Sequence, residues 1–103
     1  MTRKGYWIAR VDVEDDARYM DYVRANAEAF AKYGARFLVR GGAFEAPEGA
    51  ARDRNVVIEF PTYEAALACY ESPEYQAARA IREPVATVDA VIIEGYDGPQ
   101  PGD

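Results

Sequence analysis

The sequence contains no histidine and only one cysteine. The missing histidine excludes catalytic triads and general bases built on imidazole, haem ligation by an axial histidine, and zinc sites that contain histidine. The single cysteine, Cys69, excludes an internal disulfide bond and any metal cluster held by several cysteines. No basic run occurs and the net charge is −6, so we do not expect nucleic acid as a partner.

The length and composition indicate one domain. A chain of 103 residues is near the common size of a domain, and its 50% hydrophobic residues are enough for one core. No signal peptide or long apolar run is recognised, so we expect a soluble cytoplasmic protein with no membrane partner. We expect residues 1–97 to form the domain and residues 98–103, which are rich in glycine and proline, to form a flexible tail.

Apolar and polar residues alternate in four places, which predicts four strands, at residues 6–13, 35–41, 55–60 and 88–96. Helical spacing predicts one helix over residues 17–33 and a second, interrupted helix over residues 63–71 and 73–83. The order β-α-β-β-α-β is that of the α+β, ferredoxin-like fold. Both helices then cover one face of a four-stranded antiparallel sheet, in which the last strand lies beside the first, the first beside the third and the third beside the second.

Short signals mark the predicted helix ends. The acidic residues 14–16 can cap the first helix, and since three neighbouring carboxylates do not by themselves form a coordination shell, we predict no metal site there. Gly34 can end that helix in the left-handed conformation, while Ser72 and Pro73 suit the restart of the second helix. The residues of the first helix that we expect to be buried are Met20, Val23, Ala27 and Phe30.

Each predicted strand carries one charged residue within apolar sequence. The four residues are Arg10, Arg40, Glu59 and Glu94. Because side chains alternate between the two faces of a strand, the pattern in each strand places the charge opposite the more apolar face. We therefore expect all four charges on the face that the helices leave open, in the spatial order Glu94, Arg10, Glu59, Arg40.

An open face with both charged and apolar residues favours association with a second copy of the chain. The simplest arrangement is a twofold homodimer in which the two sheets face each other. The space between the sheets would be a cavity with polar and apolar walls.

Five short strings of the sequence resemble one family. They are GYWIA at residues 5–9, FLVRGG at 37–42, RNVVIEFP at 54–61, ACYESPEYQ at 68–76 and EGY at 94–96. Over residues 4–97 they resemble the bacterial family known as domain of unknown function 1330. The resemblance implies a dimeric α/β barrel, a group that includes small cofactor-free monooxygenases and lactone isomerases. It implies no activity, since the family has no established one, and the histidines that some members of the wider group use are absent here.

The strand charges suggest a site for a small anionic or aromatic metabolite in the cavity on the open face. Arg10 and Arg40 would hold the anion, because a guanidinium group matches a carboxylate, and Glu59 or Glu94 would move a proton without a cofactor. The alternative is a non-catalytic structural or regulatory dimer, in which the charges form a buried ion-pair network. Removing one partner of such a pair typically costs about 3–5 kcal/mol, so these residues would then matter for folding alone.

The second helix offers further candidates. Tyr75, Arg79 and Arg82 share one helix face and could bind an anion at the cavity mouth, with Tyr75 and Arg79 as the predicted ligand-binding pair. The alternative is a solvated face that pairs with nearby carboxylates. We expect Trp7 to lie in the core and Cys69 to be an inert buried thiol.

Overall fold

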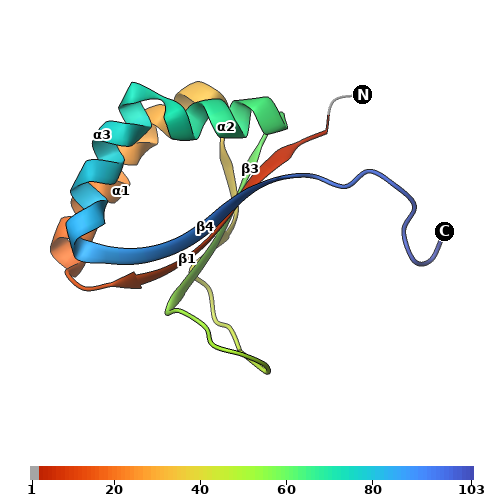
Figure 1. Ribbon diagram of the computed structural model, residues 1–103, viewed down its shortest axis with the longest axis horizontal. Helices are drawn as coiled ribbons and strands as arrows, with labels where there is room; N and C mark the ends of the chain where they lie inside the picture. The colour runs from red at the N-terminus through yellow and green to blue at the C-terminus, as the bar shows by residue number, and fades with distance from the viewer. Residues whose placement is uncertain (1–2) are drawn as a thin grey trace.

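The structure, a computed structural model, describes residues 3–103. Its strands form one antiparallel sheet in the order β2-β3-β1-β4, which confirms the predicted ferredoxin-like arrangement. The helices lie on one side of this sheet, and the long loop between β2 and β3 projects away from them (Figure 1). The elements are β1 (Gly5–Val13), α1 (Asp16–Tyr33), β2 (Arg36–Arg40), β3 (Arg54–Phe60), α2 (Tyr63–Glu71), α3 (Pro73–Arg82), a short 3-10 turn (Glu83–Val85) and β4 (Ala86–Glu94).

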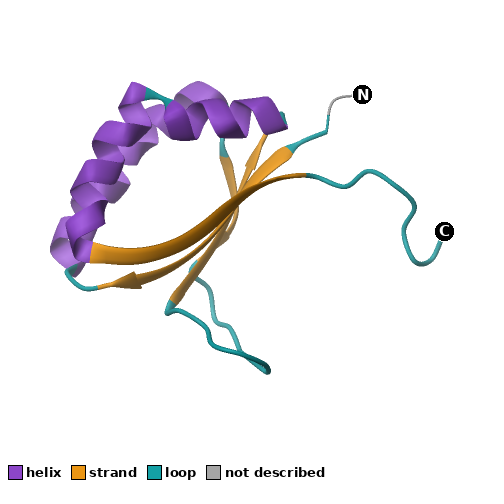
Figure 2. Cartoon of the chain, in the orientation of Figure 1, coloured by secondary structure: helices purple, strands orange, loops and turns teal. Residues whose placement is uncertain are grey.

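The helix ends follow the signals in the sequence (Figure 2). The Asp15 carboxylate accepts a hydrogen bond from a backbone N–H of the first turn of α1, at 3.1 Å, so the acidic run acts as a cap. Gly34 ends α1 with a φ of 75°, a conformation that glycine adopts without strain. Ser72 separates α2 from α3 and caps α3, with Pro73 at the first helical position.

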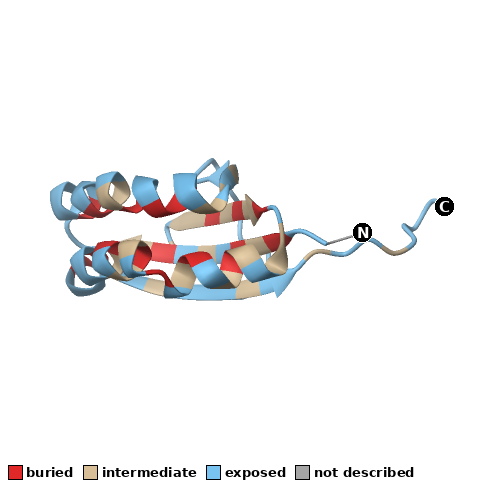
Figure 3. Ribbon diagram, turned by 90° about the horizontal axis from the view of Figure 1, so that it is seen from above, coloured by how far each residue is buried: buried red, intermediate tan, exposed pale blue. Residues whose placement is uncertain are grey.

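The core lies between the helices and the covered face of the sheet (Figure 3). Trp7 packs there against four other aromatic rings. The Trp7 ring lies 5.3 Å from that of Phe30, 5.1 Å from that of Phe60 and 4.9 Å from that of Tyr75, measured between centroids. Its indole N–H donates a hydrogen bond to the carbonyl oxygen of Ala66, at 2.9 Å. Because both the ring and its polar nitrogen are satisfied, Trp7 is the core residue that the sequence predicted.

The buried face of α1 differs from the predicted one. Met20 is 47% exposed and Ala27 is exposed as well, so their predicted places in the core are wrong, whereas Phe30 is buried as predicted. A tyrosine ring buries more area than a methionine side chain, and the hydroxyl of Tyr22 finds a buried partner in that of Tyr75, at 2.8 Å. The residues of α1 that are buried are Tyr19, Tyr22, Asn26, Ala29 and Phe30.

A bulge in β2 changes the face on which Arg40 lies. Phe37 pairs with Ile58, but the next partners are Val39 with Val57, so Leu38 is one extra residue in β2. Beyond this bulge every side chain of β2 points to the opposite face from the one that simple alternation predicts. Arg40 therefore lies on the face that the helices cover, and the prediction that it lies on the open face is wrong.

The face of β4 was also predicted wrongly. Ile92 pairs with Trp7 of β1, and Glu94 pairs with Gly5, so both belong to the side of the sheet that faces the helices. Both faces of β4 are apolar, and alternation alone could not choose between them; the register with β1 decides. Glu94 is exposed at the end of the strand, where Arg3 donates a hydrogen bond to it at 3.2 Å.

The chain leaves the sheet at the end of β4 and extends away from the body of the protein (Figure 1). The backbone N–H of Gly95 donates to the carbonyl oxygen of Lys4 at 2.7 Å, and Arg3 pairs with Asp97 at 3.0 Å. The flexibility of residues 98–103 stays a prediction. Within residues 3–103, no helix has the length and apolar character needed to cross a membrane.

Candidate functional site

A cavity of about 500 Å³ lies between the helices and the covered face of the sheet. This volume is in the range of pockets for small molecules. The sequence predicted a different cavity, between the open faces of two copies of the chain, and that cavity stays a prediction. Much of the wall is aromatic, and the rings that contribute are those of Trp7, Tyr19, Tyr22, Phe30, Phe37, Tyr70 and Tyr75.

Four arginines reach this largely apolar space, namely Arg40, Arg54, Arg79 and Arg82. Arg79 donates hydrogen bonds to Gln76 and Glu83, both at 3.4 Å. The other three arginines form no ion pair with a carboxylate of residues 3–103. Three guanidinium groups therefore face the cavity without a negative partner.

The contacts of these three groups are with aromatic rings. The Cζ atom of Arg82 lies 5.5 Å from the ring centroid of Tyr22, and that of Arg54 lies 5.8 Å from the ring of Tyr19. The Cζ atom of Arg40 lies 4.0 Å from the ring of Phe37.

Arg82 is the most constrained of the set. It is 8% exposed, and its buried Nε has no hydrogen-bond partner among the described residues. The Nε atoms of Arg54 and Arg79 are also buried and also lack a hydrogen-bond partner among the described residues. Leaving a buried N–H without a hydrogen-bond partner is unfavourable, and an anion bound in the cavity would supply the missing acceptor.

Asn26 adds a neutral polar group to the wall. It is 6% exposed, lines the cavity and makes no side-chain hydrogen bond within residues 3–103. An amide offers both a donor and an acceptor, so Asn26 can orient a polar ligand. Among the described residues, Glu83 is the one carboxylate that lines the cavity, and it is held by Arg79.

Two buried groups of the core are poor bases and nucleophiles. Burial raises the pKa of Tyr75 far above its ordinary value, because the phenolate would lie in an apolar surrounding. Burial also raises the pKa of the Cys69 thiol to about 12. Tyr75 therefore acts as a neutral wall residue, and Cys69 is the inert thiol that the sequence predicted.

The structure divides the predicted site residues into two groups. Arg40, Tyr75 and Arg79 line the cavity between helices and sheet, together with Arg82. Arg10, Glu59 and Glu94 lie outside it, so the predicted set of four strand charges does not form one site. The binding roles predicted for Arg10, Arg40, Tyr75 and Arg79, and the catalytic roles predicted for Glu59 and Glu94, stay predictions.

Sequence reasoning did not assign a role to Arg54, Tyr19, Tyr22 or Asn26. A signal for Arg54 was available, because it stands two and four residues before Val56 and Ile58 and so shares their face of β3. The three residues of α1 recur at helical spacing and lead to Phe30, but so does the predicted stripe that begins at Met20. The rotation of α1 against α3 and the sheet decides between the two stripes.

Glu59 lies on the open face, and its surroundings make it a weaker base than a free glutamate. The Lys4 ammonium donates a hydrogen bond to the carboxylate at 3.2 Å, and the Tyr6 hydroxyl donates another at 3.1 Å. These bonds hold the pKa of Glu59 below its ordinary value, against the opposing effect of partial burial. This geometry does not favour the predicted proton transfer.

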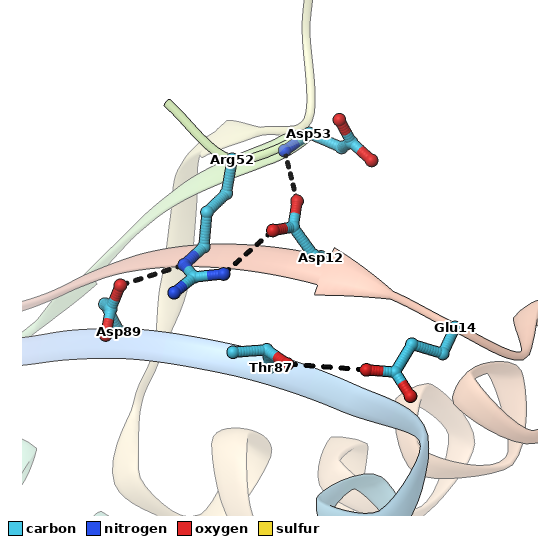
Figure 4. Close-up of polar contacts among 6 residues, drawn as sticks. All are labelled: Asp12, Glu14, Arg52, Asp53, Thr87 and Asp89. Atoms are coloured by element: carbon cyan, nitrogen blue, oxygen red, sulfur yellow. Dashed lines mark hydrogen bonds and ion pairs between the residues drawn. The ribbon is translucent and has the colours of Figure 1, made fainter. Parts of the chain in front are cut away.

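The open face also anchors the β2–β3 loop (Figure 4). Arg52 of the loop lies between Asp12 of β1 and Asp89 of β4, with a distance of 2.8 Å to each carboxylate. The backbone N–H of Asp53 donates to the second oxygen of Asp12 at 2.9 Å. The loop is thereby fixed across two neighbouring strands. Arg10, on the same face, lines a shallow hollow at the boundary of β1 and β4.

Comparison with protein families identifies the chain. The sequence profile of the family described as "Domain of unknown function (DUF1330)" matches residues 4–96. The chain belongs to this family. A search of curated proteins finds no matching sequence.

Solved structures with the same fold come from several bacteria. A protein of unknown function from Rhodopseudomonas palustris has a TM-score of 0.75 and 15% identity, over 95% of this chain and 86% of that one. The cofactor-independent oxygenase SnoaB from Streptomyces nogalater has a TM-score of 0.65 and 14% identity, over 97% and 99%. A dimeric ferredoxin-like protein of unknown function from Thermobifida fusca has a TM-score of 0.52 and 21% identity, over 91% and 92%. At these identities the similarity shows the fold alone.

Proposed function

We propose that this DUF1330 protein binds a small organic anion with an apolar or aromatic body in the cavity between its helices and its sheet. The observation that carries the proposal is the set of three arginines, Arg40, Arg54 and Arg82, that face the cavity without a carboxylate partner. Arg82 is buried and Arg54 is half-buried, and a guanidinium group that leaves water without gaining a carboxylate favours an anion as the occupant of the cavity. The aromatic walls favour an apolar body.

The proposed site differs from the one predicted from sequence in position but keeps part of its composition. Arg40 would contribute to anion binding, as predicted, and Tyr75 and Arg79 would contact the ligand from α3. Since Glu59 and Glu94 lie outside the cavity, the proposal is binding and does not include a proton transfer by these residues.

The test is a comparison of two probes of similar shape and different charge. Benzoate and benzyl alcohol would each be titrated into the full chain by calorimetry, with thermal unfolding as a second measurement. We expect benzoate to bind and to raise the unfolding temperature, and benzyl alcohol to bind at least about tenfold more weakly, because it forms no charge-assisted hydrogen bond. Equal binding of the two probes, or no binding of benzoate or of any other aromatic anion, would contradict the proposal.

A pair of variants locates the binding. Arg82→Met removes a guanidinium group from the cavity, while Arg24→Met removes one from the solvent side of α1, where the side chain is 67% exposed. Circular dichroism would show that both variants are folded. We expect loss of benzoate binding in the first variant and no change in the second; equal behaviour of the two variants would place the site elsewhere.

The open face supports a second part of the proposal, that two copies of the chain associate through their sheets. Large apolar side chains are exposed there, and those with 42–55% exposure are Ile8, Leu38, Val39, Val91 and Ile93. Such a patch favours an interface. Two solved relatives by fold, from Thermobifida fusca and Bacteroides fragilis, are described as dimeric.

Light scattering during gel filtration would test the dimer. We expect a dimer for the natural chain and a monomer for Val91→Asp, which places a charge within the proposed interface. Met20→Asp, a similar change at an exposed position of α1, is the control and should stay dimeric. A monomeric natural chain would contradict the proposed dimer.

A further inference from the structure

The wall of the cavity carries more positive charge than one singly charged anion would neutralise. Its charged lining consists of four arginines and one glutamate, so three positive charges remain uncompensated. This excess is local, because the whole chain has a net charge of −6. One negative charge on a ligand would leave most of this excess in place.

The positions of the arginines show that more than one of them can contact the same ligand. Arg54 and Arg82 approach neighbouring rings, those of Tyr19 and Tyr22, whose centroids are 5.4 Å apart. These two guanidinium groups therefore lie at the same end of the cavity, although they come from β3 and α3.

The other two arginines extend the positive wall from that end. Arg40 stands on β2 opposite Val56, one position along the covered face from Arg54. Arg79 lies one helical turn before Arg82 on α3. The positive wall thus comes from two strands and one helix.

We infer that the natural ligand carries at least two negative charges on its apolar or aromatic body. An aromatic dicarboxylate and a phosphate monoester of an aromatic alcohol share this chemistry. A guanidinium group binds either anion through paired hydrogen bonds, and arginines on different elements can bind the two charges at once. This inference rests on the proposed function and specifies its ligand class.

Glu83 supports the same conclusion. Its carboxylate occupies Arg79 at 3.4 Å, and it is 63% exposed. Arg79 is thus held by an exposed side chain, which a ligand with a second negative charge can replace.

The experiment uses three probes with one aromatic ring, namely benzoate, isophthalate and phenyl phosphate. Each would be titrated into the full chain by calorimetry at the same pH, near 8, and at the same ionic strength, since salt weakens all three interactions. We expect isophthalate or phenyl phosphate to bind at least about tenfold more tightly than benzoate, because each adds charge-assisted hydrogen bonds. The tighter of the two dianions shows whether the second charge is a separate carboxylate or part of one phosphate group.

The outcomes separate this inference from the proposed function. If benzoate binds as tightly as both dianions, the cavity binds anions and the inference on charge is overturned. If no probe binds, both are overturned. Arg79→Met should reduce the ratio of the affinities for the better dianion and for benzoate, while Arg24→Met should leave this ratio unchanged. An unchanged ratio in Arg79→Met would show that Arg79 does not bind the second charge.

Discussion

Replacing Arg82 tests whether it serves binding or folding. An arginine that serves binding destabilises the unliganded protein, whereas one that serves folding stabilises it. We expect Arg82→Met to make the unliganded protein more stable. A buried charged donor without a partner costs about 1–3 kcal/mol, and Arg82 has such an Nε at 8% exposure. Its cation–π contact with the Tyr22 ring, at 5.5 Å, stabilises the fold by about 1 kcal/mol.

The net expectation is a gain of about 1 kcal/mol in the free energy of unfolding. In a domain of about 100 residues this corresponds to an increase of about 4 °C in the unfolding temperature. Methionine suits the test, since it has a similar length, fills irregular space and carries no charge. Stability at the cost of binding is the expected trade-off at a functional site.

The assay is thermal unfolding followed by circular dichroism, with urea unfolding as an independent measurement and Arg24→Met as the control. A decrease of about 4 °C or more in Arg82→Met, with the control unchanged, would refute the reasoning. Arg82 would then stabilise the fold through its ring contact, and the unpaired Nε would not be a sign of a missing anion.

Three further predictions concern the fold and the open face. Gly5→Ala should lose about 1–3 kcal/mol in urea unfolding, because its new Cβ would lie 2.6 Å from backbone atoms at the start of α2, whereas Gly42→Ala, with no atom within 4 Å, should not. Arg52→Met should release the β2–β3 loop, so that chymotrypsin cleaves faster at the exposed Phe44; an unchanged rate would show that the two ion pairs do not hold the loop. The lowered pKa of Glu59 gives stability that is present above its ordinary value of 4.5 and is lost as the pH falls through the lower folded value. Thermal unfolding between about pH 5 and pH 3 should therefore depend less on pH in Glu59→Gln, and equal slopes would contradict this reasoning.

Much of the fold could be predicted because its signals are local. The caps at Asp15 and Ser72, the left-handed Gly34 and the alternation in β1 and β3 each depend on a few neighbouring residues. Those signals were sufficient for the order of elements, and that order restricts the strand arrangement to the observed one. The buried position of Trp7 follows from the same alternation.

The candidate site could be predicted only in part. Arg79 and Arg82 were recognised as one helix face, because helical spacing is a local property. Tyr19, Tyr22 and Asn26 were missed, since the face that α1 buries is set by its packing against α3. Two overlapping stripes of α1 fit helical spacing, and the predicted one included Phe30 correctly but Met20 wrongly.

By itself, the sequence determined the secondary structure, the strand order and a composition rich in arginine and aromatic residues without histidine. Only the tertiary structure decided on which side of the sheet two of the four strand charges lie. The reason is the register between strands: one extra residue, Leu38, turns Arg40 toward the helices, and the pairing of β4 with β1 moves Glu94 out of the expected set. Register is fixed by hydrogen bonds to a neighbouring strand, which no pattern within a single strand contains.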